Sequence, residues 1–175
     1  MDRLILIRNE VNAILEEQPN QQLRDEGYIH LYGVSNLSAM LAIKRGMNME
    51  IASVIGMLHD IYTYKYQYAK NHAALGVDEA GHILDKVNVF SAEEVQLIKV
   101  AIANHSDKKN KQDKYSELIK DADLMQNFLY YNVVKEKHKK RLKKALKDCG
   151  IKVKKKFLIS EKVDEKVNEK DENLV

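Results

Sequence analysis

Apolar residues recur three or four positions apart in one segment of this chain after another, and this periodicity restricts the fold more than any other feature. It is the spacing of an amphipathic helix with one buried face. The 175 residues include only one proline and seven glycines. Because many short strands would need frequent turns, we predict an all-α fold, a single-domain bundle of about six to seven helices.

Local signals bound the expected helices. Pro19 ends the first helix, Gly46 follows the second, and Ser91 forms a capping box with Glu94 that opens the fifth. The tyrosine-rich stretch after Asp60 is expected to be a polar connection. The predicted helices cover residues 4–15, 28–44, 49–60, 72–87, 92–105 and 115–132, with a seventh inside 133–150.

Several classes of protein are excluded. Cys149 is the only cysteine, so the chain cannot form an internal disulfide or a zinc site built of thiolates. No stretch reaches the roughly 18 apolar residues of a membrane span. We therefore expect a cytoplasmic protein that does not contact membranes and that would bind metal through histidine and carboxylate side chains.

Four of the six histidines are predicted to face the interior. His30, His59 and His105 each continue an apolar stripe, and His72 heads a ridge of small residues. A single inward histidine is more often a hydrogen-bonded core residue than a ligand. Four on four helices are harder to bury, because each imidazole needs a partner. A shared metal ion would provide one, as it does inside other helix bundles.

The remaining two histidines, His82 and His138, lie among charged residues and are expected at the surface. Neither is predicted to take part in a site.

The order of these residues resembles a known family. The segments IHLYGVSNLSAMLA, VIGMLHDIYTYKY, VAIANHSDK and LIKDADLMQ are similar to those of HD-domain metal-dependent phosphohydrolases, over about residues 26–132. Carried over position by position, the family's ligands fall on His30, His59, Asp60 and Asp123, with His72 and His105 added in members that hold two metals. The resemblance thus implies a centre of one or two divalent metal ions.

The late aspartate is chosen by the resemblance alone. Asp123 matches the family's Ala-Asp-x-Leu pattern, whereas helical periodicity does not separate it from Asp121, since the two lie at opposite edges of the same apolar stripe. Asp121 is then either a neighbour of the ligands or a surface acid.

The resemblance also implies the chemistry, which is hydrolysis of a nucleotide or another small phosphate ester or anhydride by metal-activated water. Imidazole and carboxylate ligands suit Mn, Fe, Zn, Co or Mg. Asp60, as bridging ligand, and Lys65 are the expected catalytic residues, and Lys65 and Lys108 are the expected substrate-binding cations. An ordinary surface lysine is an equally good interpretation of each.

Charge is unevenly distributed along the chain. Residues 1–134 have a net charge of −4, residues 135–156 of +10 and residues 157–175 of −3. We divide the chain into an N-terminal helix packing on the core (1–25), the metal-binding helical domain (26–132), a basic C-terminal helix (133–156) and a charged, flexible tail (157–175).

The alternative function is a non-catalytic regulatory module that binds a metal or nucleotide and contacts nucleic acid through the basic helix. A solvated helix whose lysine stems cover apolar surface is the favoured interpretation of that segment. The oligomeric state is not predicted.

Overall fold

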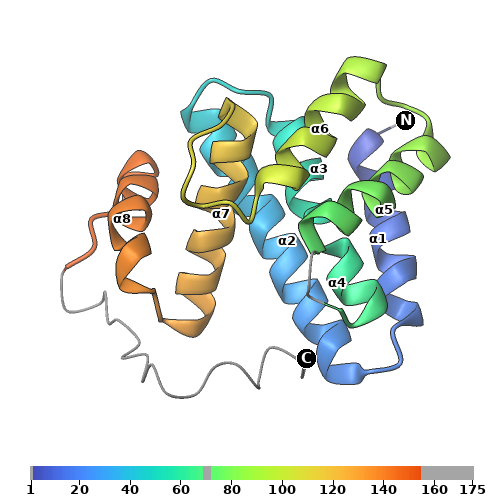
Figure 1. The fold of residues 1–175 in the computed structure, drawn as a ribbon, viewed down its shortest axis with the longest axis horizontal. Coiled ribbons are helices and arrows are strands. Elements are labelled where there is room, and N and C mark those ends of the chain that lie inside the picture. The colour runs from blue at the N-terminus through green and yellow to red at the C-terminus, as the bar shows by residue number, and fades with distance from the viewer. Residues whose placement is uncertain (1, 69–71, 155–175) are drawn as a thin grey trace.

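The computed structural model describes residues 2–68 and 72–154, and these contain helices and no strand, which confirms the all-α prediction. Figure 1 shows α2 and α3 at the centre, α1 and α5 on one side and α8 on the other. The helices are α1 (Arg3–Glu17), α2 (Gln21–Lys44), α3 (Met49–Leu58), α4 (Ile61–Tyr66), α5 (His72–Val87), α6 (Ala92–Asn104), α7 (Lys114–Tyr131) and α8 (Lys139–Asp148), with a 3₁₀ turn, η1 (Glu136–His138), before α8.

The N-terminal end of α2 differs from the prediction. Asn20 caps the helix by accepting a hydrogen bond from the backbone N–H of Leu23, so α2 begins about two turns before Tyr28. The added residues are mostly polar, and therefore carry no apolar stripe that periodicity could detect, but Gln, Arg and Glu are good helix formers.

The helical path is interrupted between α3 and α4. The sequence predicted one longer helix here, followed by a polar connection. The backbone of Asp60 leaves the helical region (φ −117°, ψ 14°), and a second short helix starts at Ile61, whose side chain is fully buried. His59 still has helical backbone angles (φ −60°, ψ −36°), so the break begins at Asp60, directly after it.

Helix α3 forms the centre of the core, because every residue from Ile51 to His59 is buried. It crosses α2 at very short range. A side chain at Gly56 would lie 2.6 Å from the Cα of Ser35, so only glycine permits this approach. The close crossing brings the end of α3 beside the middle of α2.

Helix α8 docks on α7 through Leu142, Ala145 and Leu146, which are all buried and belong to the predicted apolar seam. The helix is shorter than expected, since residues 132–135 are not helical. Ion pairs formed by Arg45 and Arg141, described below, secure it. The expected flexible tail, residues 157–175, lies outside the described residues.

Candidate metal centre

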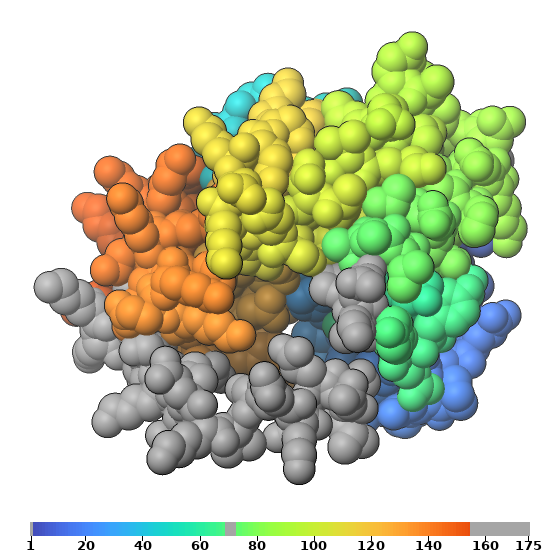
Figure 2. All heavy atoms as spheres, in the orientation of Figure 1, coloured from blue at the N-terminus to red at the C-terminus, as the bar shows by residue number. Residues whose placement is uncertain are grey.

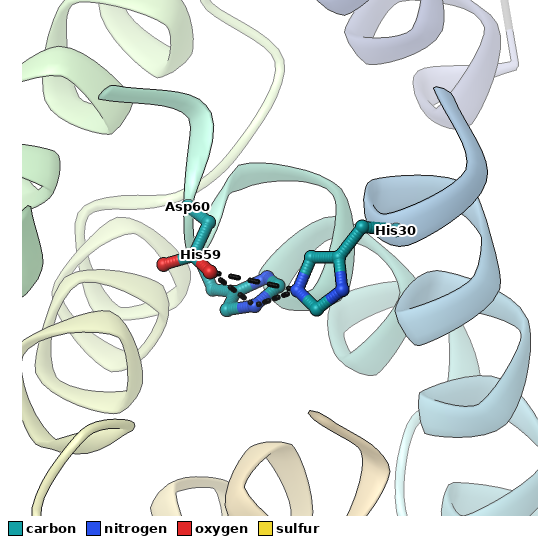
Figure 3. Close-up of side chains that lie close together, drawn as sticks. All are labelled: His30, His59 and Asp60. Atoms are coloured by element: carbon teal, nitrogen blue, oxygen red, sulfur yellow. Dashed lines mark hydrogen bonds and ion pairs between the residues drawn. The ribbon is translucent and has the colours of Figure 1, made fainter. Parts of the chain in front are cut away.

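Five of the six predicted metal ligands come together at one place. They are supplied by separate elements. His30 belongs to α2, His59 and Asp60 directly follow α3, His105 directly follows α6, and Asp123 belongs to α7. Figure 3 shows the first three pointing toward one another from α2 and from the turn after α3.

His30, His59 and Asp60 form the tightest part of the cluster. The Nε2 atoms of His30 and His59 lie 3.2 Å apart. Asp60 Oδ2 is 3.3 Å from the Nε2 of His59 and 3.5 Å from that of His30. One candidate ligand atom from each residue lies within 4.8 Å of the other two, so the three could hold a metal ion together.

The two remaining residues border this group on different sides. His105 places its Nε2 3.1 Å from the other carboxylate oxygen of Asp60, Oδ1. Asp123 Oδ1 lies 3.7 Å from the Nε2 of His30. Asp60 therefore turns one oxygen toward His30 and His59 and the other toward His105, which is the arrangement needed of a bridging carboxylate.

Backbone carbonyls orient two of the imidazoles. His59 Nδ1 lies 2.9 Å from the carbonyl oxygen of Gly56, and His105 Nδ1 lies 2.7 Å from that of Ile102. Because a carbonyl only accepts, each Nδ1 carries a hydrogen and donates it. In the neutral ring the Nε2 lone pair then points into the cluster, as in histidine metal ligands whose second nitrogen is held by a carbonyl.

The cluster favours ionised carboxylates. Burial alone would raise the pKa of Asp60, but the three surrounding imidazoles hold it well below its usual range. Burial likewise opposes ionisation of Asp123, and the Lys108 ammonium beside it still lowers its pKa. Burial lowers the pKa of His59. The two carboxylates and the Nε2 atom of His59 therefore present lone pairs rather than protons, whereas Asp60 raises the pKa of His30 and His105.

The donor set fits a divalent metal ion. An imidazole nitrogen with a free lone pair and a carboxylate oxygen are both acceptors, so their approach to within about 3.5 Å is unfavourable unless a cation or proton lies between them. Nitrogen and oxygen ligands without sulfur are those that Mn, Fe, Zn or Co accept. The burial and convergence of these side chains thus support metal binding.

The structure separates the two aspartates that periodicity left open. Asp123 faces the cluster and accepts hydrogen bonds from Lys108 Nζ (2.6 Å) and Asn127 Nδ2 (2.7 Å). Asp121 faces α2 and α8 instead, where it pairs with Arg45 (2.7 Å) and Arg141 (2.8 Å). Asp121 is therefore neither a ligand neighbour nor a surface acid, but the centre of a partly buried ion-pair network.

The two predicted substrate-binding lysines lie in different surroundings. Lys108 is beside Asp123 at the edge of the cluster. Lys65 instead forms an ion pair with Glu79 at 2.6 Å, and no contact among the described residues joins it to the cluster. A catalytic or substrate-binding role for Lys65 stays a prediction.

Two further histidines were predicted, His72 as a ligand and His82 as a surface residue. His72 is the first residue of α5, but its side chain is outside the described part of the structure, so its role as a ligand stays a prediction. His82 is exposed, as expected.

A pocket adjoins the cluster, and sequence reasoning missed it. Its volume is about 360 Å³. It is lined by Lys108, Leu124, Asn127, Tyr131, Val133, Val134, Lys135 and His138. Among these, His138 is only partly exposed rather than fully solvated. The position of Asn127, four residues after Asp123 on the same helix face, was the one available signal.

Comparison with known proteins identifies the family. The family model of the HD domain matches residues 27–127, more than half of the chain. Searches of curated proteins and of solved structures found no match. Among the described residues no helix is both long enough and apolar enough to span a membrane. HD domains bind divalent metals and are mostly hydrolases, and the matched region contains every residue of the cluster. This chain belongs to the HD-domain family.

Proposed function

We propose that this protein is a metal-dependent phosphohydrolase that acts on a nucleotide or another small phosphate compound. The observation that carries the proposal is the convergence of three histidine Nε2 atoms on the two oxygens of one carboxylate, Asp60. Such a buried arrangement is unfavourable unless a cation or a proton lies between the groups, and it is suited to one or two metal ions.

His30, His59, Asp60 and Asp123 would hold one ion, and His105, with Asp60 and the first residue of α5, His72, a second. A divalent ion bound there would supply Lewis acidity toward phosphoryl oxygens and make water nucleophilic near neutral pH. The protein's part is to keep the ligands oriented toward the ion. The carbonyls of Gly56 and Ile102 do so for two of the histidines.

Lys108 and Asn127 have a second task in this proposal. Both donate to Asp123 from the side of the cluster that adjoins the pocket. They orient that carboxylate and place a positive charge and an amide where a phosphoryl group would enter. A cation at this position would stabilise negative charge that develops on the phosphoryl oxygens.

The test compares wild type with Asp60→Asn, which keeps the size of the side chain. Metal content is measured by mass spectrometry, and hydrolysis with nucleoside mono-, di- and triphosphates and p-nitrophenyl phosphate. Wild type is expected to bind metal and hydrolyse at least one compound, with loss on chelation, and Asp60→Asn to lose both properties. The exposed histidine variant His82→Ala serves as control. Full metal content and full activity in Asp60→Asn would refute the proposal.

A non-catalytic nucleic-acid-binding module is the second candidate. The observation in its favour is a row of exposed lysines at helical spacing on α8: Lys140, Lys143, Lys144 and Lys147. Binding through such a row should weaken steeply as salt rises. Absence of RNA and DNA binding at low salt would remove this candidate.

A further inference from the structure

Three basic side chains line the pocket beside the metal centre. They come from two segments far apart in sequence. Lys108 belongs to the loop between α6 and α7, and Lys135 and His138 to the segment between α7 and α8. Figure 2 shows the loop, in yellow, beside the orange residues that precede α8. Burial and the nearby ammonium groups of Lys108, Lys137 and Lys135 lower the pKa of His138, in agreement with this convergence.

The pocket begins at the proposed metal ligands. Lys108 and Asn127 line it, and both donate hydrogen bonds to Asp123. Asn127 and Tyr131 also line a narrow gap of about 10 Å³ that reaches His30. A ligand in the pocket would thus lie next to the metal centre, and the rest of it would extend toward Lys135 and His138.

The fold places the far wall of the pocket. Val134, next to Lys135, is 3% exposed and packs in the core. On the other side of His138, Arg141 forms ion pairs with Glu117 (2.5 Å) and Asp121 (2.8 Å) of α7. These anchors flank the segment that carries Lys135 and His138, so the basic wall is held by packing and by ion pairs at both ends.

The narrow gap and the wide pocket that it adjoins differ in the charge of their lining residues. The narrow gap at His30 is bordered by the carboxylate of Glu26. The wide part is bordered by the two lysines, by the imidazole of His138, and by apolar side chains such as Leu124 and Val133. An anion is therefore attracted to the wide part. Its volume is at the lower end of the range for small-molecule sites, which limits the ligand to a small compound.

We propose that this pocket binds a second anionic group of the substrate, on the leaving-group side of the phosphoryl group that reacts. The inference rests on the proposed function and narrows it to small molecules with two adjacent anionic groups, of which a nucleoside diphosphate is one. Lys135 and His138 lie outside residues 27–127, the region that the HD-domain model matches. They are thus a feature of this chain added to the matched domain.

The first experiment measures anion binding without catalysis. Inorganic pyrophosphate is titrated calorimetrically into metal-free wild type, into Lys135→Met/His138→Gln, and into Lys143→Met. Lys143 is an exposed lysine of α8 that does not line the pocket, so it is the matched control. The double variant should bind at least about tenfold more weakly than wild type, and Lys143→Met like wild type. No binding by wild type, or equal affinity in all three, overturns the inference.

The second experiment separates this inference from the proposed function. Hydrolysis of p-nitrophenyl phosphate, which has one anionic group, is compared with that of adenosine diphosphate in the metal-loaded proteins. The double variant should raise KM for the diphosphate about tenfold and change that for p-nitrophenyl phosphate less than about twofold. Equal changes for both compounds overturn the second-anion subsite and leave the hydrolase intact. If wild type hydrolyses neither, the proposed function fails, and the pyrophosphate titration alone decides the subsite.

Discussion

Helix α7 carries two buried aspartates, two residues apart, and their surroundings are opposite in kind. Asp121 lies between the guanidinium groups of Arg45 and Arg141, which are permanently charged, and each contact is a close ion pair. Asp123 faces the imidazole of His30 and has a single ammonium partner, Lys108. Charge is balanced at the first site by the protein alone, whereas the second gathers carboxylates and lone pairs that favour a bound cation.

The difference between the partners of Asp121 and Asp123 indicates which buried charged residues in this fold are structural and which are functional. The structural network also includes Glu117, which pairs with Arg141 and Lys120, and Asp148, which pairs with Arg45. Its three acids meet three bases. In the candidate metal centre, by contrast, Asp60 is surrounded by imidazoles whose charge depends on pH. We expect the first group of residues to control stability and the second to control ligand binding.

The largest expected effect is that of Asp123→Asn. The amide keeps the shape but is a poor metal ligand, so activity should fall at least about 1,000-fold and metal affinity should drop. The free energy of unfolding of the metal-free protein should fall less than in Asp121→Asn, because Asp123 pairs with the one ammonium group of Lys108 whereas Asp121 pairs with two guanidinium groups. Steady-state kinetics and metal analysis measure the first effect, and urea unfolding the second. Unchanged activity would place Asp123 outside the centre.

The same substitution at the other aspartate, Asp121→Asn, should lower the free energy of unfolding by about 3 kcal/mol. It leaves the partly buried Arg45 and Arg141 without the carboxylate that they share. Removing one partner of a buried ion pair costs more stability than replacing the whole pair by apolar residues, because the remaining charge is unpaired. Metal content of the folded protein should stay the same. Urea unfolding beside metal analysis tests both statements, and the comparison breaks down if Asp121→Asn loses metal instead.

Lys120→Met should destabilise the protein by about 2 kcal/mol. Lys120 is fully buried, and its ammonium donates to Glu117 Oε1 (2.9 Å), to the carbonyl of Asn110 (3.0 Å) and to Gln112. These bonds tie the loop that carries Lys108 to α7. We therefore expect KM to rise in parallel with the loss of stability. Lys114→Met, at an exposed position of the same helix, is the control, and equal stability of the two variants would contradict the prediction.

The smallest expected effect is on pH dependence. Burial disfavours protonation of His30 and His105, but Asp60 outweighs it and raises the pKa of both above 6.5. In the metal-free protein, their protonation thus stabilises the fold fully below about pH 6.5, and this stabilisation is lost as pH rises through the raised pKa values.

Metal must displace these protons, so metal affinity should rise with pH through the same range, by about tenfold per pH unit for each proton released. Calorimetric metal titrations at several pH values from 6 to 8.5 measure it. Asp121→Asn should show the same slope as wild type. A pH-independent affinity would mean that His30 and His105 are not displaced by the metal.

Several features could be predicted from the sequence because they depend on neighbours along the chain. Helical periodicity placed His30, His59 and His105 on inward faces, and resemblance to the HD domain selected Asp123. Local patterns missed the early start of α2, whose first turns are polar, and the short helix α4, because a break at Asp60 and a buried Ile61 leave no periodic signal. Lys120 in the core was also missed, since a lysine is buried only where tertiary partners exist.

What the sequence by itself determined is therefore which residues face inward, because the rise and turn of a helix are local properties. Where those residues meet depends on how helices cross, and only the tertiary structure decided that. The close approach of α2 to Gly56 brings His30 beside His59. The ion pair between Arg141 of α8 and Asp121 helps to hold Lys135 and His138 at the pocket. Two aspartates on one helix took different roles because one met arginines and the other met imidazoles.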